Sequence, residues 1–136
     1  MLFRSLNDLQ RATGVAIILV THDFGIVAAI ADRVAVMYAG RIVEIGRTID
    51  IFDHPAHPYT RALLRCLPDV ELKRERLIEI GGQPPDLARL PPGCPFASRC
   101  PERQSRCEIE YPPAVSMRDG HMASCWAVPA LEARAG

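Results

Sequence analysis

The stretch Val15-Ala-Ile-Ile-Leu-Val-Thr-His-Asp23 decides the fold class. Its first six residues are apolar and rich in β-branched side chains, and the run is too short for a helix. We therefore predict a strand over residues 15–20 that is buried on both faces, as in a parallel sheet. A helix is expected over residues 3–13, because leucines recur there at helical spacing and Gly14 can end it. A helix followed by a buried strand indicates an α/β protein.

Downstream of this stretch, local signals predict a short helix and a hairpin. Residues 24–31 are apolar without alternation, which favours a helix that Asp23 can cap. The apolar segments 33–38 and 41–45 flank Ala39-Gly40, where the glycine supplies the positive φ of a hairpin turn.

Two further helices and a weakly patterned region follow. Thr48 can cap a helix over residues 49–53, and Pro58 suits the first position of a helix that runs to about Leu67. Residues 77–80 are expected to form a short strand, and residues 81–93 a proline-rich loop.

Composition sets limits on the class of protein. The 136 residues are 49% hydrophobic and 24% charged, which is enough for one modest core with an appendage. Sixteen basic and sixteen acidic residues cancel, so no net field favours nucleic acid or an anionic membrane. The longest apolar run is far shorter than the roughly 20 residues of a spanning helix, and no secretory signal is seen. We expect a cytosolic chain with reduced cysteines.

The amino-acid composition of the sequence changes near residue 68. Nine of the twelve prolines and four of the five cysteines follow that point. We therefore expect one part over residues 1–67 and a second over residues 68–136.

His22 is the first candidate functional residue. It directly follows the predicted strand, and open α/β sheets bind ligands at the carboxyl ends of their strands. An imidazole there can donate a hydrogen bond to a phosphate oxygen and respond to its charge. A histidine that only caps a loop would have the same spacing, so position alone leaves both interpretations open.

These residues resemble a known family. Residues 16–46, AIILVTHDFGIVAAIADRVAVMYAGRIVEIG, are similar to the segment of ABC-transporter ATPases that runs from the last core strand through the histidine switch to the closing hairpin. Residues 51–64, IFDHPAHPYTRALL, resemble the P-x-HPYT-x-x-LL element of the oligopeptide/dipeptide/nickel importer branch. Residues 82–86 and 90–101 resemble that branch's carboxy-terminal extension. The resemblance covers about residues 2–128.

The resemblance implies a fold, a role and partners. Residues 1–67 would be the last third of an ABC ATPase (P-loop NTPase) domain, and residues 68–136 an irregular cysteine-containing extension. His22 would be the switch histidine that contacts the γ-phosphate of ATP bound with magnesium, while Asp23 only caps a helix. The expected partners are a second ATP-binding subunit, the membrane permease subunits and, through them, a substrate-binding protein. The subunit would lie peripherally on the cytoplasmic face of the bacterial membrane and contact it only through the permease.

Several parts of an ABC ATPase are missing from this sequence. It contains no G-x-x-x-x-G-K-[ST] phosphate loop, no signature with a serine-glycine pair, and no apolar strand ending in Asp-Glu. In the family these parts would precede Leu2. We expect a chain of these residues alone not to hydrolyse ATP, because phosphate-loop and metal positioning carry most of that chemistry.

Four cysteines form the second candidate site. Their spacing is Cys94-x5-Cys100-x6-Cys107-x17-Cys125, within a proline-rich region that has too few apolar residues for a core of its own. Structural zinc usually uses C-x2-4-C pairs, which are absent, whereas iron–sulfur clusters occur on more varied spacings. Zinc remains an alternative, as do cysteines that are merely reduced or linked in disulfides. The resemblance implies a 4Fe-4S cluster, with a structural role preferred over redox sensing.

The remaining candidates have simpler interpretations. Cys66 is expected to be a small buried hydrophobe on the Pro58 helix, and His54 and His57 to be turn and cap residues. His121 could replace a ligand, although the cysteines suffice, and Trp126 is expected to cover one side of the site.

Three function classes follow from these observations. The first is part of a transport ATPase subunit, and the second is an independent metal-binding or regulatory module without a nucleotide role. The third, part of a soluble ABC protein, is disfavoured by the HPYT element and the cysteine tail.

Overall fold

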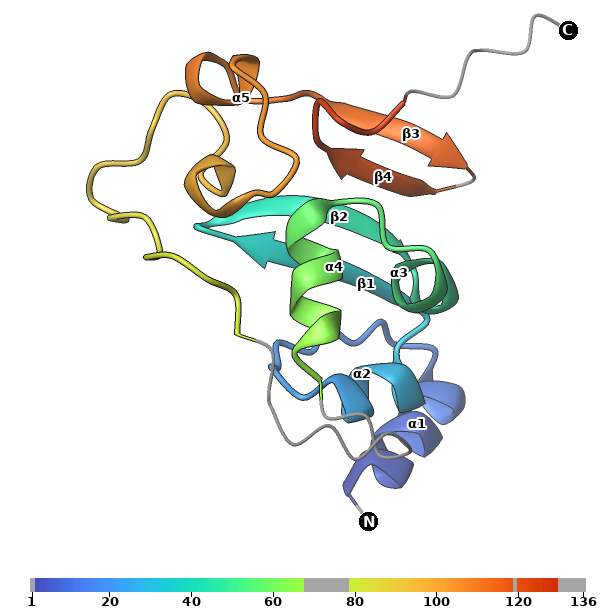
Figure 1. Ribbon diagram of the computed structural model, residues 1–136. Coiled ribbons are helices and arrows are strands. Elements are labelled where there is room, and N and C mark those ends of the chain that lie inside the picture. Colours follow the sequence, from blue (N-terminus) through green and yellow to red (C-terminus); the bar gives the residue numbers. More distant parts are fainter. Residues whose placement is uncertain (1, 68–78, 119, 130–136) are drawn as a thin grey trace, which may run out of the picture. The chain divides into compact units, whose positions relative to one another are not determined.

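The computed structural model describes residues 2–67, 79–118 and 120–129 (Figure 1). The chain forms two compact units, Met1–Asp32 and Arg33–Gly136, and each is described by itself. Within the described ranges, no helix is long and apolar enough to cross a bilayer.

The amino-terminal unit contains two helices. Helix α1 spans Leu2–Thr13, and Gly14 follows it at φ 70°, donating its N–H to the carbonyl of Gln10 at 2.8 Å. Helix α2 spans Phe24–Ile30, and the carboxylate of Asp23 accepts the N–H of Ile26 at 3.1 Å. The predicted helices, the glycine end of the first and the Asp23 cap of the second are confirmed.

The predicted strand over residues 15–20 is wrong for this chain. These residues form neither helix nor strand, and their side chains are exposed, with Ile18 at 93% and Val20 at 92%. A strand exists only through hydrogen bonds to a neighbour, and a strand buried on both faces also needs covering layers. No described strand pairs with this segment, so its apolar composition has nothing to pack against.

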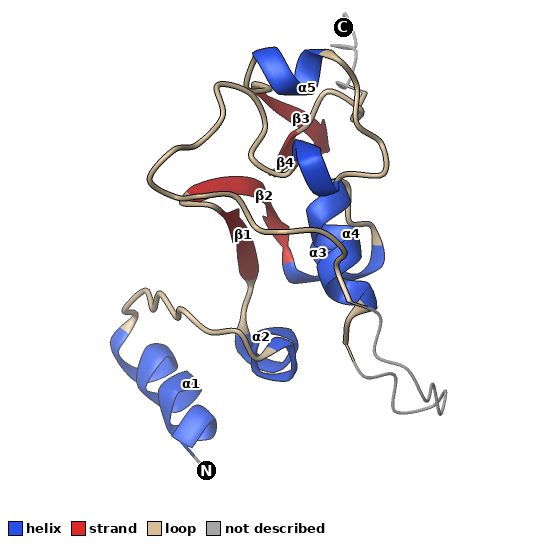
Figure 2. Cartoon of the chain, turned by 60° about the vertical axis from the view of Figure 1, so that its left-hand side comes forward, coloured by secondary structure: helices blue, strands red, loops and turns tan. Residues whose placement is uncertain are grey.

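The carboxy-terminal unit is built on a four-stranded antiparallel sheet with the order β1-β2-β4-β3 (Figure 2). Strands β1 (Arg33–Tyr38) and β2 (Arg41–Arg47) form the predicted hairpin. Ala39 and Gly40 connect them at φ 49° and 77°, so both central turn residues are left-handed. That turn matches the right-handed twist of the flanking strands.

Two strands that the sequence did not reveal complete the sheet. Strands β3 (Ala114–Arg118) and β4 (His121–Ser124) pair with each other, and β4 pairs with β2 through Glu44 opposite Ala123 and Ile45 opposite Met122. The α/β class is confirmed, but the observed sheet is antiparallel rather than parallel. The extension is therefore not wholly irregular, and its functional division from residues 1–67 stays a prediction.

Two helices follow the hairpin. Helix α3 spans Thr48–Asp53, but Thr48 is its first helical residue rather than its cap. The cap position is occupied by Arg47, whose guanidinium instead binds the carboxylate of Asp50 at 2.8 Å. Helix α4 spans Pro58–Arg65, with proline in the first turn as predicted, and packs over the β1–β2 hairpin (Figure 1).

Residues 79–113, the described part of the chain between α4 and β3, have little regular structure. They contain the 3-10 turn η1 (Ala97–Arg99) and the short helix α5 (Arg106–Ile109). Residues 81–93 form the predicted loop, whereas the strand predicted over residues 77–80 lies partly outside the described residues and is not seen at residues 79–80.

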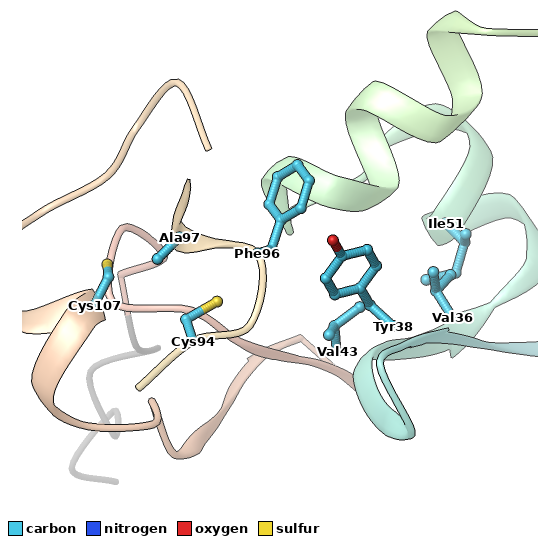
Figure 3. Packing of buried hydrophobic residues seen from close by; sticks show 8 residues of the cluster. All are labelled: Val36, Tyr38, Val43, Ile51, Cys94, Phe96, Ala97 and Cys107. Carbon is cyan, nitrogen blue, oxygen red and sulfur yellow. The ribbon is translucent and has the colours of Figure 1, made fainter. Parts of the chain in front are cut away.

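The core joins the hairpin to the cysteine-bearing loops. Tyr38 and Phe96 meet edge to face with ring centroids 5.3 Å apart, and Tyr59 of α4 lies 4.5 Å from Tyr38. In Figure 3, Phe96 and Tyr38 lie between two buried cysteines and the aliphatic side chains of the sheet. The described part of the extension shares one core with the hairpin, made up of Val36, Tyr38, Val43, Ile51, Cys94, Phe96, Ala97 and Cys107.

Candidate functional site

His22 is exposed at a bend between α2 and the irregular segment that precedes it. The next residue, Asp23, closes the turn by donating its N–H to the hydroxyl of Thr21 at 3.0 Å and by capping α2. These two bonds fix the backbone beside His22, while its ring faces solvent. His22 belongs to the amino-terminal unit and the four cysteines belong to the other, so each candidate site is described by itself.

The four cysteines of the extension line one cavity. Its remaining wall includes His57, Phe96, Glu102 and Trp126, and its volume is about 10 Å³, close to that of one water-sized sphere. The sequence analysis proposed these four cysteines as one site. The fold brings them to this cavity from three separate segments, which carry Cys94 and Cys100, Cys107, and Cys125.

Backbone contacts hold these segments together. The N–H of Cys94 donates to the carbonyl of Cys107 at 2.7 Å, and Cys100 ends the η1 turn. A side chain at Gly93 would overlap the backbone of Cys107, so this close approach requires glycine. Cys125 directly follows β4, whose pairing with β2 determines where that thiol lies.

The thiols influence one another. Burial raises the pKa of Cys94, Cys100 and Cys125, and the charge of neighbouring cysteines raises each pKa further. For Cys94 that neighbour is Cys107, and for Cys100 it is first Cys125. With their pKa values raised in this way, Cys94, Cys100 and Cys125 are protonated at neutral pH.

The cavity is not arranged as a finished single-ion site. Among the described residues, no three His, Cys, Asp or Glu side chains are placed so that they could hold a metal ion. All five cysteines are free. Cys66 stands apart as predicted, but it is half-buried at the end of α4, with its thiol donating to the carbonyl of Ala62 at 3.2 Å.

Trp126 lies at the cavity wall, as the sequence predicted. Its indole N–H donates to the carbonyl of Glu110 at 3.1 Å, and the guanidinium of Arg106 stacks 3.5 Å from the ring centroid. These contacts tie the segment after β4 to α5.

A buried network around Glu44 lies behind the cavity. The Glu44 carboxylate is 1% exposed and accepts the N–H groups of Ala56 at 2.8 Å and His57 at 2.9 Å. His121 places Nε2 2.7 Å from the same carboxylate, which can only accept, so Nε2 donates. His121 is thus a partner of Glu44 and not a lining residue of the cavity.

His57 links this network to the cavity. It is the cap of α4, as predicted, and its Nδ1 accepts the N–H of Tyr59 at 3.0 Å. Burial lowers the pKa of His57 to about 4, although the charge of Glu44 opposes this, so the ring is neutral at physiological pH. The sequence analysis missed the role of Glu44. A carboxylate between the apolar residues Val43 and Ile45 could have indicated a buried, hydrogen-bonded group.

Comparison with known proteins shows which family the chain resembles. Residues 43–107 match the model of the oligopeptide/dipeptide transporter C-terminal region. Over these residues the chain is similar to that family. The matched segment contains the Glu44 network, the HPYT helix α4 and three of the four cavity cysteines.

Individual relatives agree with the transporter C-terminal region. The chain is 52% identical over 120 residues to the dipeptide transport ATP-binding protein DppD of Bacillus subtilis, covering 88% of this chain and 36% of the relative. It is 45% identical over 121 residues to the oligopeptide transport ATP-binding protein OppD of Haemophilus influenzae, covering 89% of this chain and 37% of the relative. It is 44% identical over 121 residues to the oligopeptide transport ATP-binding protein OppD of Escherichia coli, covering 89% of this chain and 36% of the relative.

These matches confirm the resemblance predicted from the THD, HPYT and cysteine motifs. The chain spans little more than a third of the length of the curated relatives it matches. It is similar to a C-terminal part of such ATP-binding proteins.

Proposed function

We propose that this chain is the C-terminal part of the ATP-binding subunit that drives peptide import through an ABC transporter. The observation that carries the proposal is the 52% identity over 120 residues to a dipeptide transport ATP-binding protein. The subunit would pair with a second ATP-binding subunit and act on permease subunits that receive substrate from a binding protein. It would lie at the cytoplasmic face of the membrane, held there through the permease.

His22 is the residue of this chain that we assign to catalysis. In the whole subunit, ATP with magnesium supplies the phosphoryl group that is transferred to water. The exposed imidazole of His22 would donate a hydrogen bond to a γ-phosphate oxygen and stabilise charge that develops there. The Asp23 cap and its bond to Thr21 support this by holding the backbone on either side of the histidine.

The test is His22→Ala in the full-length subunit assembled with its partners. Loss of one donor to a developing oxyanion is expected to lower kcat about a hundredfold, while ATP binding stays nearly unchanged. His54→Ala serves as the control, because His54 is also exposed but only ends α3. Unchanged turnover in the His22 variant would remove the assignment.

We also propose that the four cysteines of the cavity hold a 4Fe-4S cluster. The donor set fits, since each of the four irons takes one thiolate and four thiols line one cavity. The cysteine-bearing segments leave a cavity of about 10 Å³ between them. The bound cluster would cross-link these segments; Gly93 and the β2–β4 pairing bring them together beforehand.

Metal analysis of anaerobically purified protein tests this site. About four irons and four acid-labile sulfides per chain are expected, with loss of both in Cys107→Ser. Cys66→Ser is the matched control, because Cys66 does not line the cavity and should keep full iron content. One zinc per chain would support the zinc alternative, and no bound metal would leave the cysteines as thiols.

A second candidate is an independent metal-binding or regulatory module without a nucleotide role. The observation that favours it is that the core and all four cavity cysteines lie within Arg33–Gly136. Co-purification of the full-length protein with permease subunits separates the candidates, since only a transport subunit needs that contact.

A further inference from the structure

The bend that carries His22 is attached to regular structure on one side only. The residues before it, 15–20, form neither helix nor strand, and Ile18 and Val20 are almost fully exposed. On the other side, helix α2 begins at Phe24. The position of His22 therefore depends on how its two neighbours in the sequence connect it to α2.

Thr21 supplies the bond that closes this bend. Its side-chain oxygen accepts the N–H of Asp23 at 3.0 Å, so residues 21–23 form a turn in which His22 is the middle residue. Threonine is branched at Cβ, which restricts its χ1 and holds the hydroxyl in place. The closed turn limits the directions in which the Cα–Cβ bond of His22 points.

Asp23 joins the closed turn to α2. Its carboxylate accepts the N–H of Ile26 at 3.1 Å, and its carbonyl accepts the N–H of Val27 at 3.1 Å. A Cβ at Gly25 would lie only 3.2 Å from the same carboxylate oxygen, so glycine leaves room for this cap. Both polar groups of Asp23 are thus engaged with the first turn of the helix.

The bond between Asp23 and Thr21 contributes little to folding. Asp23 is exposed and Thr21 is half-buried, so water can replace the hydroxyl as the acceptor of the Asp23 N–H. A function for this hydroxyl therefore lies in the geometry that it imposes on the neighbouring histidine.

We propose that Thr21 is a positioning residue for ATP hydrolysis, whose hydroxyl holds His22 where the imidazole donates to a γ-phosphate oxygen. This inference rests on the catalytic assignment of His22 made above. A donor to a developing oxyanion acts only when it is correctly placed, and a misplacement of about 1 Å can cost about a hundredfold in rate. Thr21 does not contact the nucleotide and acts through His22.

Three threonine variants of the full-length subunit, assembled with its partners, test this role. Thr21→Val keeps the shape of the side chain but removes the acceptor, so kcat should fall about tenfold while KM for ATP stays unchanged. Thr21→Ser restores the acceptor and should recover most of the turnover. Thr13→Val is the matched control and should turn over as wild type, because the exposed Thr13 hydroxyl donates only to the carbonyl of Leu9 within α1, at 2.7 Å.

A double-variant cycle distinguishes positioning from a general structural effect. If Thr21 acts through His22, adding Thr21→Val to His22→Ala lowers kcat no further, whereas a structural role predicts the same factor in both backgrounds. A further tenfold loss in the double variant would therefore overturn the inference. Equal kcat in wild type and Thr21→Val would also overturn it, while the His22 assignment would stand. Unchanged turnover in His22→Ala alone would remove both.

The turn itself is tested without turnover. In the 136-residue chain, the amide of Asp23 should exchange with solvent more slowly in wild type and Thr21→Ser than in Thr21→Val, as measured by NMR at neutral pH. The side chains of His22 and Asp23, which set the intrinsic exchange rate of this amide, are the same in all three. Equal rates in the three chains would mean that Thr21 does not hold this N–H, and would overturn the inference independently of any activity.

Discussion

At the residue scale, Glu44 connects several segments of the molecule, although the sequence analysis did not single it out. One carboxylate accepts two backbone N–H groups and one imidazole N–H, and these donors come from the α3–α4 connection and from β4. A buried carboxylate survives only when its oxygens are bonded in this way. Glu44 therefore joins the hairpin to α4 and to the extension.

Replacement of Glu44 tests this role. Glu44→Ala removes the acceptor and leaves three buried donors unpaired, so the free energy of unfolding should fall by about 3 kcal/mol or more. Urea unfolding of the metal-free chain under reducing conditions measures it. The matched control is Glu108→Ala, whose ion pair with Arg103 at 3.3 Å is exposed and should contribute less than about 1 kcal/mol. Similar losses in both variants would contradict the role given to Glu44.

At the element scale, the sequence predicts what local chemistry determines. The Asp23 cap, the turn at Ala39-Gly40 and the proline at the start of α4 each depend on a few neighbouring residues, and all are confirmed. The prediction that Thr48 caps α3 is wrong, because Arg47 occupies the cap position and its guanidinium binds Asp50. Local patterns thus identify elements well, although a single residue can shift a boundary.

Elements that depend on partners distant in the sequence cannot be predicted from local sequence patterns. The Val15–Val20 segment has the composition of a buried strand, yet strand formation needs a neighbour that the described residues do not supply. Strands β3 and β4 were missed for the converse reason. Their short, mixed sequences gain strand structure from pairing with β2, where Ile45 lies opposite Met122.

The candidate sites also contain features that local sequence predicts and features that depend on distant residues. His22 and the four cysteines were recognised through motif and resemblance, and their roles stay predictions. What sequence alone could not provide is the wall of the cavity, where His57 and Phe96 from distant segments meet the cysteines.

At the scale of the whole molecule, the two units differ in how they are stabilised. Arg33–Gly136 has a four-stranded sheet, a shared core and the buried Glu44 network. In the unit Met1–Asp32, two helices flank an irregular apolar segment whose side chains are exposed. Local opening costs least where few buried contacts and few backbone hydrogen bonds hold a segment.

The rate of amide hydrogen exchange in the isolated chain should therefore be higher before residue 33 than after it. We expect amides of β2, which pairs on both sides with β1 and β4, to exchange most slowly. Amides of residues 15–20 should exchange almost as fast as in an unfolded peptide, because no helix or strand includes them. Mass spectrometry of peptides from short pulses in deuterated buffer at neutral pH measures both segments in one sample, with β2 as the internal control. Strong protection of residues 15–20 in the isolated chain would mean that the apolar run pairs with another strand after all, in agreement with its sequence and against the fold described above.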